Sequence, residues 1–281
     1  MRRPLVLAEE IFEEYHYTSN AFNVDFYNDV FVTAGRPYIA GQNWRVIVDP
    51  GVVIGSNADN STTTLAELPS AYAARTGVFP RILHVVIYGR IQGKGGDGGD
   101  GQVDYDAKNG GWGGGGGGGA GAPPGQGGLG DQPPFATDGD DGSSDFRSDG
   151  GLGYKQLLEP ETDARDGTSG KKGTGALYLD MNIRLSVLGE GKLWAGGGGG
   201  GGGKSVGVQG QPYNRWGGYG GSPGRYGGIG GDGLNNVRYD PGGSGHQPGQ
   251  SGKGLSDLNQ HTVTVIQIEN GSYIGSELGL Q

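Results

Sequence analysis

The stretch LSVLGEGKLWAGGGGGGGG, residues 185–203, decides the fold, because it joins a β-type pattern directly to a run of eight glycines. Its first half has apolar residues on both sides of Gly191, which predicts a strand, a tight turn and a second strand. Three other stretches repeat the pattern around Gly51, Gly89 and Gly271: VIVDPGVVIGS (46–56), VVIYGRIQGKGG (85–96) and VTVIQIENGSYIGS (263–276). The turn glycines lie 38, 102 and 80 residues apart, and this irregular spacing argues against a fixed-period solenoid. It predicts similar strand units that are separated by insertions of unequal length.

Glycine marks a boundary along the chain. Of 281 residues, 66 are glycine, 58 of these lie between Gly89 and Gly254, and the first 88 residues hold only five. Hydrophobic residues make up 33%, below the roughly 45–50% of an average globular chain. The glycine-rich part therefore cannot bury an ordinary apolar core.

Glycine also recurs with a period of three, in GGDGGDG (95–101) and in GGYGGSPGRYGGIGGDG (217–233). A polyproline II-type helix has three residues per turn and no internal hydrogen bonds. When such helices pack side by side, glycine lets their backbones come close enough to bond to each other. The pattern predicts a bundle of polyglycine II helices, with slow amide exchange across residues 196–233. A flexible linker is the alternative, but linkers of this kind are rich in Gly and Ser and do not carry tryptophan and tyrosine at this density.

The predicted fold class is mainly β strand-turn-strand units plus a packed bundle of polyglycine II helices, with little α-helix. The stretch NVDFYNDVFVTAGRP predicts a short helix that begins near Asn23 or Asp25 and ends at Gly35, and residues 62–80 are expected to form a loop with one helical turn. The predicted organisation is an N-terminal attachment region with the short helix (1–43), β-strand units (44–92), the glycine-rich bundle with exposed loops (93–254, interrupted by the strand unit 183–195) and a C-terminal β-strand unit (255–281).

Motifs for cofactors and metals are weak. Gly198 to Ser205 matches the phosphate-binding loop pattern, but the residues that follow are rich in glycine and cannot form the helix that this loop requires. GGIGGDGLN (227–235) fits the calcium nonapeptide once, whereas that motif works only in tandem. The acidic DGDDGSSD (138–145) is expected to be a solvated turn, and calcium binding by the longer acidic loop 132–161 stays open. We expect no cofactor and no metal.

Catalysis and nucleic-acid binding are not expected. The four histidines are scattered, no nucleophile elbow is present, and the formal charge of −9 disfavours contact with phosphates. The N-terminus lacks the longer apolar run of a secretory signal, and no 18-residue apolar span occurs, so we expect a chain that does not pass a secretion machinery of that kind.

Aromatic residues interrupt the glycine runs, and we expect them in loops that leave the bundle. Tyrosine and tryptophan offer large, stiff contact surfaces at a low entropic cost, which suits recognition of a partner. The alternative is that they only cap the ends of the bundle. The candidate receptor-binding residues are Tyr105, Trp112, Phe135, Phe146, Tyr154, Tyr213, Trp216, Tyr219 and Tyr226.

Residues 21–281, with glycine runs that follow strand-glycine units and aromatic loops between them, resemble the glycine-rich tip adhesins on the long tail fibres of T-even-type phages. The resemblance implies a component of the virion tail whose exposed loops touch a receptor on the host surface, either an outer-membrane protein or a glycan. It also implies other virion tail proteins as partners, in a homotrimer or as a cap on a trimeric fibre. The alternative is a purely structural virion protein without receptor contact.

Overall fold

The computed structural model describes residues 10–58, 72–101, 111–112, 115–130, 139–143, 154–155, 169–199, 255, 261–268 and 273–274. Strands predominate in this part of the chain, and its only helix is the six-residue η1 (Asn28–Thr33). The prediction of a mainly β protein with little α-helix is therefore confirmed. A helix of six residues is also far too short to cross a membrane, and the described ranges contain no longer one.

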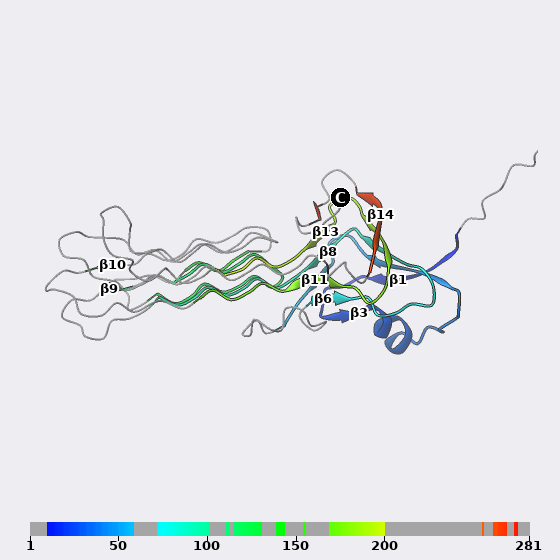
Figure 1. The fold of residues 1–281 in the computed structure, drawn as a ribbon, viewed down its shortest axis with the longest axis horizontal. Coiled ribbons are helices and arrows are strands. Elements are labelled where there is room, and N and C mark those ends of the chain that lie inside the picture. The colour runs from blue at the N-terminus through cyan, green and yellow to red at the C-terminus, as the bar shows by residue number, and fades with distance from the viewer. Residues whose placement is uncertain are drawn as a thin grey trace, which may run out of the picture.

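Three parallel sheets form the body of the protein (Figure 1). The first contains, in order, β1 (Phe12–Tyr17), β4 (Asn43–Val48), β7 (Leu83–Ile87), β12 (Ile183–Val187) and β14 (Val263–Ile268). The second contains β2 (Ala21–Phe22), β5 (Val53–Gly55), β8 (Arg90–Gln92), β13 (Lys192–Trp194) and β15 (Tyr273–Ile274). The third contains β3 (Val24–Asp25), β6 (Tyr72–Arg75) and β11 (Gly175–Tyr178).

The two strands of each predicted unit lie in different sheets and do not pair with each other. Instead, units far apart in the sequence stack in parallel register: Val46 lies opposite Val85, which lies opposite Leu185. The chain turns between the sheets at the predicted Gly51 and Gly191, since Gly51 has a φ of +79° and a Cβ on Gly191 would collide with the Ile87 carbonyl. The fourth predicted turn glycine, Gly271, lies outside the described residues. The body is therefore a coil of parallel strands, in which each turn stacks on the one before it.

The argument from spacing against a solenoid is wrong in this respect. The long insertions leave the coil at one corner, between the second sheet and the third: they lie between β5 and β6, between β8 and β11, and between β13 and Leu255, which bridges to Leu177 in parallel. Because these insertions come between strands of the coil, they hide its period in the sequence, while the described strands keep their register. The coil also begins one unit earlier than predicted, with β1 and β2, whose connection lacks a turn glycine.

The hydrophobic core fills the space between the sheets. In β4, the side chains of Trp44, Val46 and Val48 are at most 1% exposed, whereas Ile47 between them is 7% exposed and Arg45 is not buried. Near the first turns of the coil, the core is rich in aromatic rings. The ring centroid of Phe31 lies 5.2 Å from that of Trp44 and 5.2 Å from that of Phe79. This cluster packs the short helix η1 against the coil.

Of two local predictions, one is confirmed and one is corrected. Helical residues begin directly after strand β3 (Val24–Asp25), and Asp25 Oδ1 accepts the Asn28 backbone N–H at 3.1 Å, so Asp25 lies at the start of the helix as predicted. It ends as expected before Gly35, which has a φ of +63°. Residues 72–75 were predicted to be part of a loop with one helical turn, but they form strand β6. This strand is the middle one of the third sheet, and its Tyr72, Ala73 and Ala74 are buried.

Two histidines of the first sheet have shifted pKa values. Burial, together with the charges of Arg45 and Arg184, lowers the pKa of His84 to about 4, and its Nε2 lies 2.9 Å from Ser186 Oγ. A hydrogen bond of 2.8 Å to Asp49 Oδ1 instead raises the pKa of His16 above its ordinary value.

We expect these two shifts to act in separate pH windows. As the pH falls from the ordinary histidine pKa of 6.5 to about 4, the unfolded chain takes up a proton at His84 that the folded chain excludes, so stability is lost. The stabilisation by protonated His16 is complete below pH 6.5 and is lost as the pH rises through its raised pKa. Denaturant midpoints between pH 4 and pH 8 check this: His84→Gln should flatten the acid limb alone and His16→Gln the neutral limb alone. Unchanged slopes in both variants would contradict the assignment.

Candidate functional site

Glycine segments extend from the coil as a backbone-bonded array. We call residues 93–101, 115–130, 139–143, 169–174 and 195–199 the glycine array. Two of its segments run antiparallel and are joined by hydrogen bonds at every third residue. These bonds run from Gly116 N–H to Gly99 O (2.7 Å), from Gly119 N–H to Gly96 O (2.8 Å) and from Ala122 N–H to Gly93 O (3.0 Å).

The segment 115–122 lies at the centre of the array, and every residue in it whose burial is described is buried. Its backbone bonds to neighbours on several sides: Gly128 N–H to Gly116 O (2.7 Å), Gly125 N–H to Gly119 O (2.9 Å) and Gly197 N–H to Ala120 O (2.8 Å). The outer segments also form hydrogen bonds with each other. The Lys171 N–H donates to Asp97 O (2.7 Å), and the Gly199 N–H donates to Lys171 O (2.9 Å). The backbone itself thus forms the interior of this part of the molecule.

Side chains have no room in this interior. A Cβ on Gly119 would collide with the carbonyl of Gly197, and one on Gly96 would collide with the carbonyl of Lys171. Because the obstacle is backbone in both places, it cannot move aside as a flexible side chain could. The glycines are required by this close approach, independently of any turn.

Aspartates on the outside of the array bind its outward-facing amides. Asp97 Oδ1 accepts the Gln126 N–H at 3.0 Å, and Asp100 Oδ1 accepts the Leu129 N–H at 2.8 Å, so the three-residue period continues in the side chains. Asp97 Oδ2 also lies 3.0 Å from Lys171 Nζ. Sequence reasoning did not assign these residues a role, although the spacing of the aspartates in GGDGGDG carries the signal.

The array places a short strand pair far from the coil. Strands β9 (Gly111–Trp112) and β10 (Tyr154–Lys155) pair antiparallel, with Trp112 directly opposite Tyr154. They lie at the end of the array opposite to the three sheets (Figure 1). Two of the nine candidate receptor-binding residues, 42 positions apart in sequence, are thereby brought together. The other candidates lie outside the described residues: Tyr105, Phe135, Phe146, Tyr213, Trp216, Tyr219 and Tyr226.

Metal and nucleotide motifs are only partly covered by the described residues. Within these, no group of three or more histidines, aspartates or glutamates is placed to hold a metal ion. Most of the acidic loop 132–161 lies outside them, as do the lysine and serine of the phosphate-loop match and the nonapeptide 227–235. The described chemistry of the array includes backbone hydrogen bonds and the Asp97–Lys171 ion pair.

Comparison with solved structures finds a similarity to the gp37–gp38 adhesin tip complex of the bacteriophage S16 long tail fiber. The TM-score is 0.40 at 15% sequence identity, and the similarity covers 94% of this chain and 82% of that chain. This is the class of protein that the sequence resembles. No protein-family model and no curated protein matches the chain.

A methyl group at the centre of the array should disrupt it. We expect Gly119→Ala to lower the free energy of unfolding by about 1–3 kcal/mol or more, because the new Cβ meets a backbone carbonyl. Amide exchange at Gly116, Gly119 and Gly128 should become faster. The matched control, Gln126→Ala, removes only an exposed side chain of the same array and should leave exchange unchanged. Equal behaviour of the two variants would show that the close backbone approach does not stabilise the protein.

Proposed function

We propose that this chain is a non-enzymatic component of a phage tail fibre or tail tip that presents aromatic and polar loops to a receptor on the host cell. The observation that carries the proposal is the β9–β10 pair, with Trp112 opposite Tyr154 at the far end of the glycine array (Figure 1). The host receptor is an outer-membrane protein or a glycan, and the chain is located in the virion tail.

We assign the glycine array to packed polyglycine II helices. Hydrogen bonds at every third residue, from Gly116 and Gly119 to Gly99 and Gly96, support this assignment, since three residues make one turn of such a helix. An isolated helix of this type has no hydrogen bonds of its own and would be flexible. Packing supplies the bonds, and the result is a stiff support for the loops.

Stiffness matters for recognition by aromatic side chains. A tyrosine or tryptophan that is already held in place loses little conformational entropy when it meets a partner. The described segments of the array are bonded to one another, and β9 pairs with β10 beyond them. Such an arrangement suits receptor binding better than a purely structural role, which would not call for paired aromatic positions at a distal end.

Attachment to the virion is assigned to the first turn of the coil. Residues 1–43 include β1, the end strand of the first sheet, and β2, the end strand of the second. We propose that this end contacts other tail proteins, either within a homotrimer or as a cap on a trimeric fibre. The tip and the attachment surface then lie on different parts of the molecule, the array and the coil.

Adsorption of the purified chain tests this function. We expect the chain to bind the plating host of a phage that carries it and to compete with that phage for adsorption. Trp112→Ala and Tyr154→Ala should each fold normally and weaken binding about thirtyfold, since aromatic anchors contribute about 2 kcal/mol or more. Tyr88→Ala, which removes a 38% exposed tyrosine from the coil, is the matched control and should adsorb normally.

The alternatives predict different results. A purely structural virion protein would neither adsorb nor compete, whichever variant is used. If Trp112→Ala and Tyr154→Ala instead unfold the protein, these aromatics cap the array, and the receptor-binding surface must lie in other loops.

A further inference from the structure

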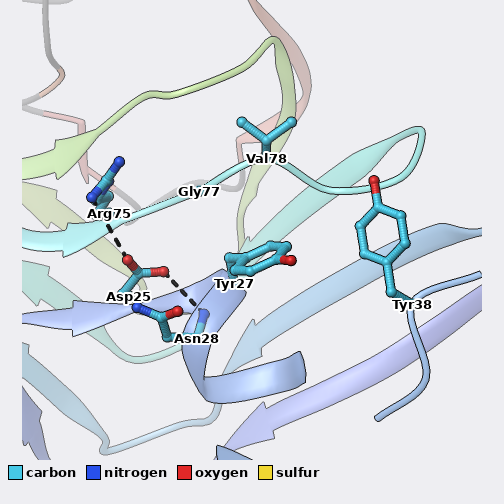
Figure 2. Close-up of a pocket in the computed structure, with 7 residues that line it drawn as sticks. All are labelled: Asp25, Tyr27, Asn28, Tyr38, Arg75, Gly77 and Val78. Carbon is cyan, nitrogen blue, oxygen red and sulfur yellow. Dashed lines mark hydrogen bonds and ion pairs between the residues drawn. The ribbon is translucent and has the colours of Figure 1, made fainter. Parts of the chain in front are cut away.

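A pocket of about 490 Å³ lies on the coil, among residues of β3, η1 and β6 and their flanking segments. Its walls come from β3, the start of η1, the segment after η1 and the end of β6 with the residues that follow it. Figure 2 shows the residues that line it: Asp25, Tyr27, Asn28, Tyr38, Arg75, Gly77 and Val78. Its volume is within the range of about 300–1,000 Å³ that is usual for small-molecule sites.

Two tyrosines give the pocket an aromatic wall. The ring centroids of Tyr27 and Tyr38 lie 6.3 Å apart. The ring centroid of Phe31 lies 5.0 Å from that of Tyr27 and 5.3 Å from that of Tyr38. Phe31 in turn packs on the buried Trp44, so the wall is held by the core. Tyr38 remains 53% exposed, which leaves its ring accessible to a ligand. Gly77 lets Tyr27 approach the backbone closely, because a Cβ there would collide with the tyrosine Cβ.

Polar groups gather on the other side of the pocket (Figure 2). Arg75 is fixed by Asp180, which accepts hydrogen bonds from Nε at 2.8 Å and from Nη2 at 2.9 Å. Its third nitrogen, Nη1, lies 3.8 Å from Asp25 Oδ2, which is longer than a hydrogen bond. Asp25 Oδ1 accepts the Asn28 backbone N–H at 3.1 Å. The Nη1 donors, Asp25 Oδ2 and the Asn28 carboxamide are thus placed to bind a ligand.

The charges of the pocket disfavour an anion. Arg75 pairs with both Asp25 and Asp180, so the three groups together carry one negative charge. A cation could not use the Arg75 Nη1 donors, whereas a neutral hydroxyl group can accept from Arg75 and donate to Asp25. What remains is a set of hydrogen-bond donors and acceptors beside a flat apolar wall.

We propose that this pocket binds one pyranose ring of a neutral saccharide, as a second binding site separate from the tip. A pyranose has an apolar C–H face, which stacks on Tyr38 and Tyr27, and a rim of hydroxyl groups that both donate and accept hydrogen bonds. Asp25 accepts from one hydroxyl, Arg75 donates to its neighbour, and the Asn28 carboxamide does both.

Neutral monosaccharides added to the purified full chain test the proposal. The probes are the methyl glycosides of glucose, galactose, mannose and N-acetylglucosamine, measured by saturation-transfer NMR and calorimetry. At least one should bind with a Kd in the millimolar range, and glucuronate should bind more weakly than glucose. Tyr38→Ala and Asn28→Ala should each weaken binding tenfold or more, whereas Tyr38→Phe keeps the ring and should bind nearly as the unaltered chain does.

Controls separate this site from the tip and from loss of folding. Tyr88→Ala removes an exposed tyrosine outside the pocket and should bind the saccharide normally, as should Trp112→Ala at the tip. Gly77→Ala provides a second test within the pocket, because it displaces Tyr27. No binding by any probe, or binding that survives both Tyr38→Ala and Gly77→Ala, would overturn the proposal. Neither result depends on adsorption to host cells, so the tip function and this site fail independently.

Discussion

At Gly119, a neighbouring carbonyl occupies the space where any other residue would have its Cβ atom. The structure depends on this close approach of backbone to backbone. It lets one segment bond to neighbours on several sides, and these bonds offset the large entropy that glycine loses on ordering. Each bond contributes only about 1 kcal/mol, so the array is stable only when many form together.

The coil supplies the register that the array needs. Gln92 of β8 lies opposite Trp194 of β13, and the next bond, from Gly93 N–H to Trp194 O at 2.9 Å, already belongs to the array. From there the contact continues through Gly96 N–H to Gly197 O at 2.8 Å. The second sheet therefore passes its alignment directly into the glycine segments. Apolar packing fixes the coil, and the coil fixes the position of residues that have no side chains to align them.

The sequence predicted the elements better than their arrangement. The strand units around Gly51, Gly89 and Gly191 and the end of the helix before Gly35 follow from local patterns that depend on nearby residues alone. Parallel stacking of distant units was missed because insertions at one corner removed the regular spacing. The strand 72–75 was missed because its alanines are weak strand formers, and burial beside Leu177 decides their conformation.

The two candidate sites differ in how far they could be read from sequence. The aromatic positions at 112 and 154 stand out because they interrupt glycine runs, but their pairing needed the fold. The pocket left no comparable signal, since Asp25, Tyr38 and Arg75 come from segments that only the stacking of turns brings together. Polar and aromatic residues of this kind are common on any surface, and their function depends on their mutual placement.

The central position of residues 115–122 has a consequence for the order of assembly during synthesis. Ala120 O and Gly96 N–H both bond to Gly197, which is translated more than 70 residues after the central segment. Until then, these groups have only water as a partner. The array therefore closes late, after the first turns of the coil have stacked, and contacts of such long sequence separation make this closure slow. A chain that ends before residue 197 lacks the partner of both groups, so its array stays incomplete, and its coil still lacks β14 and β15.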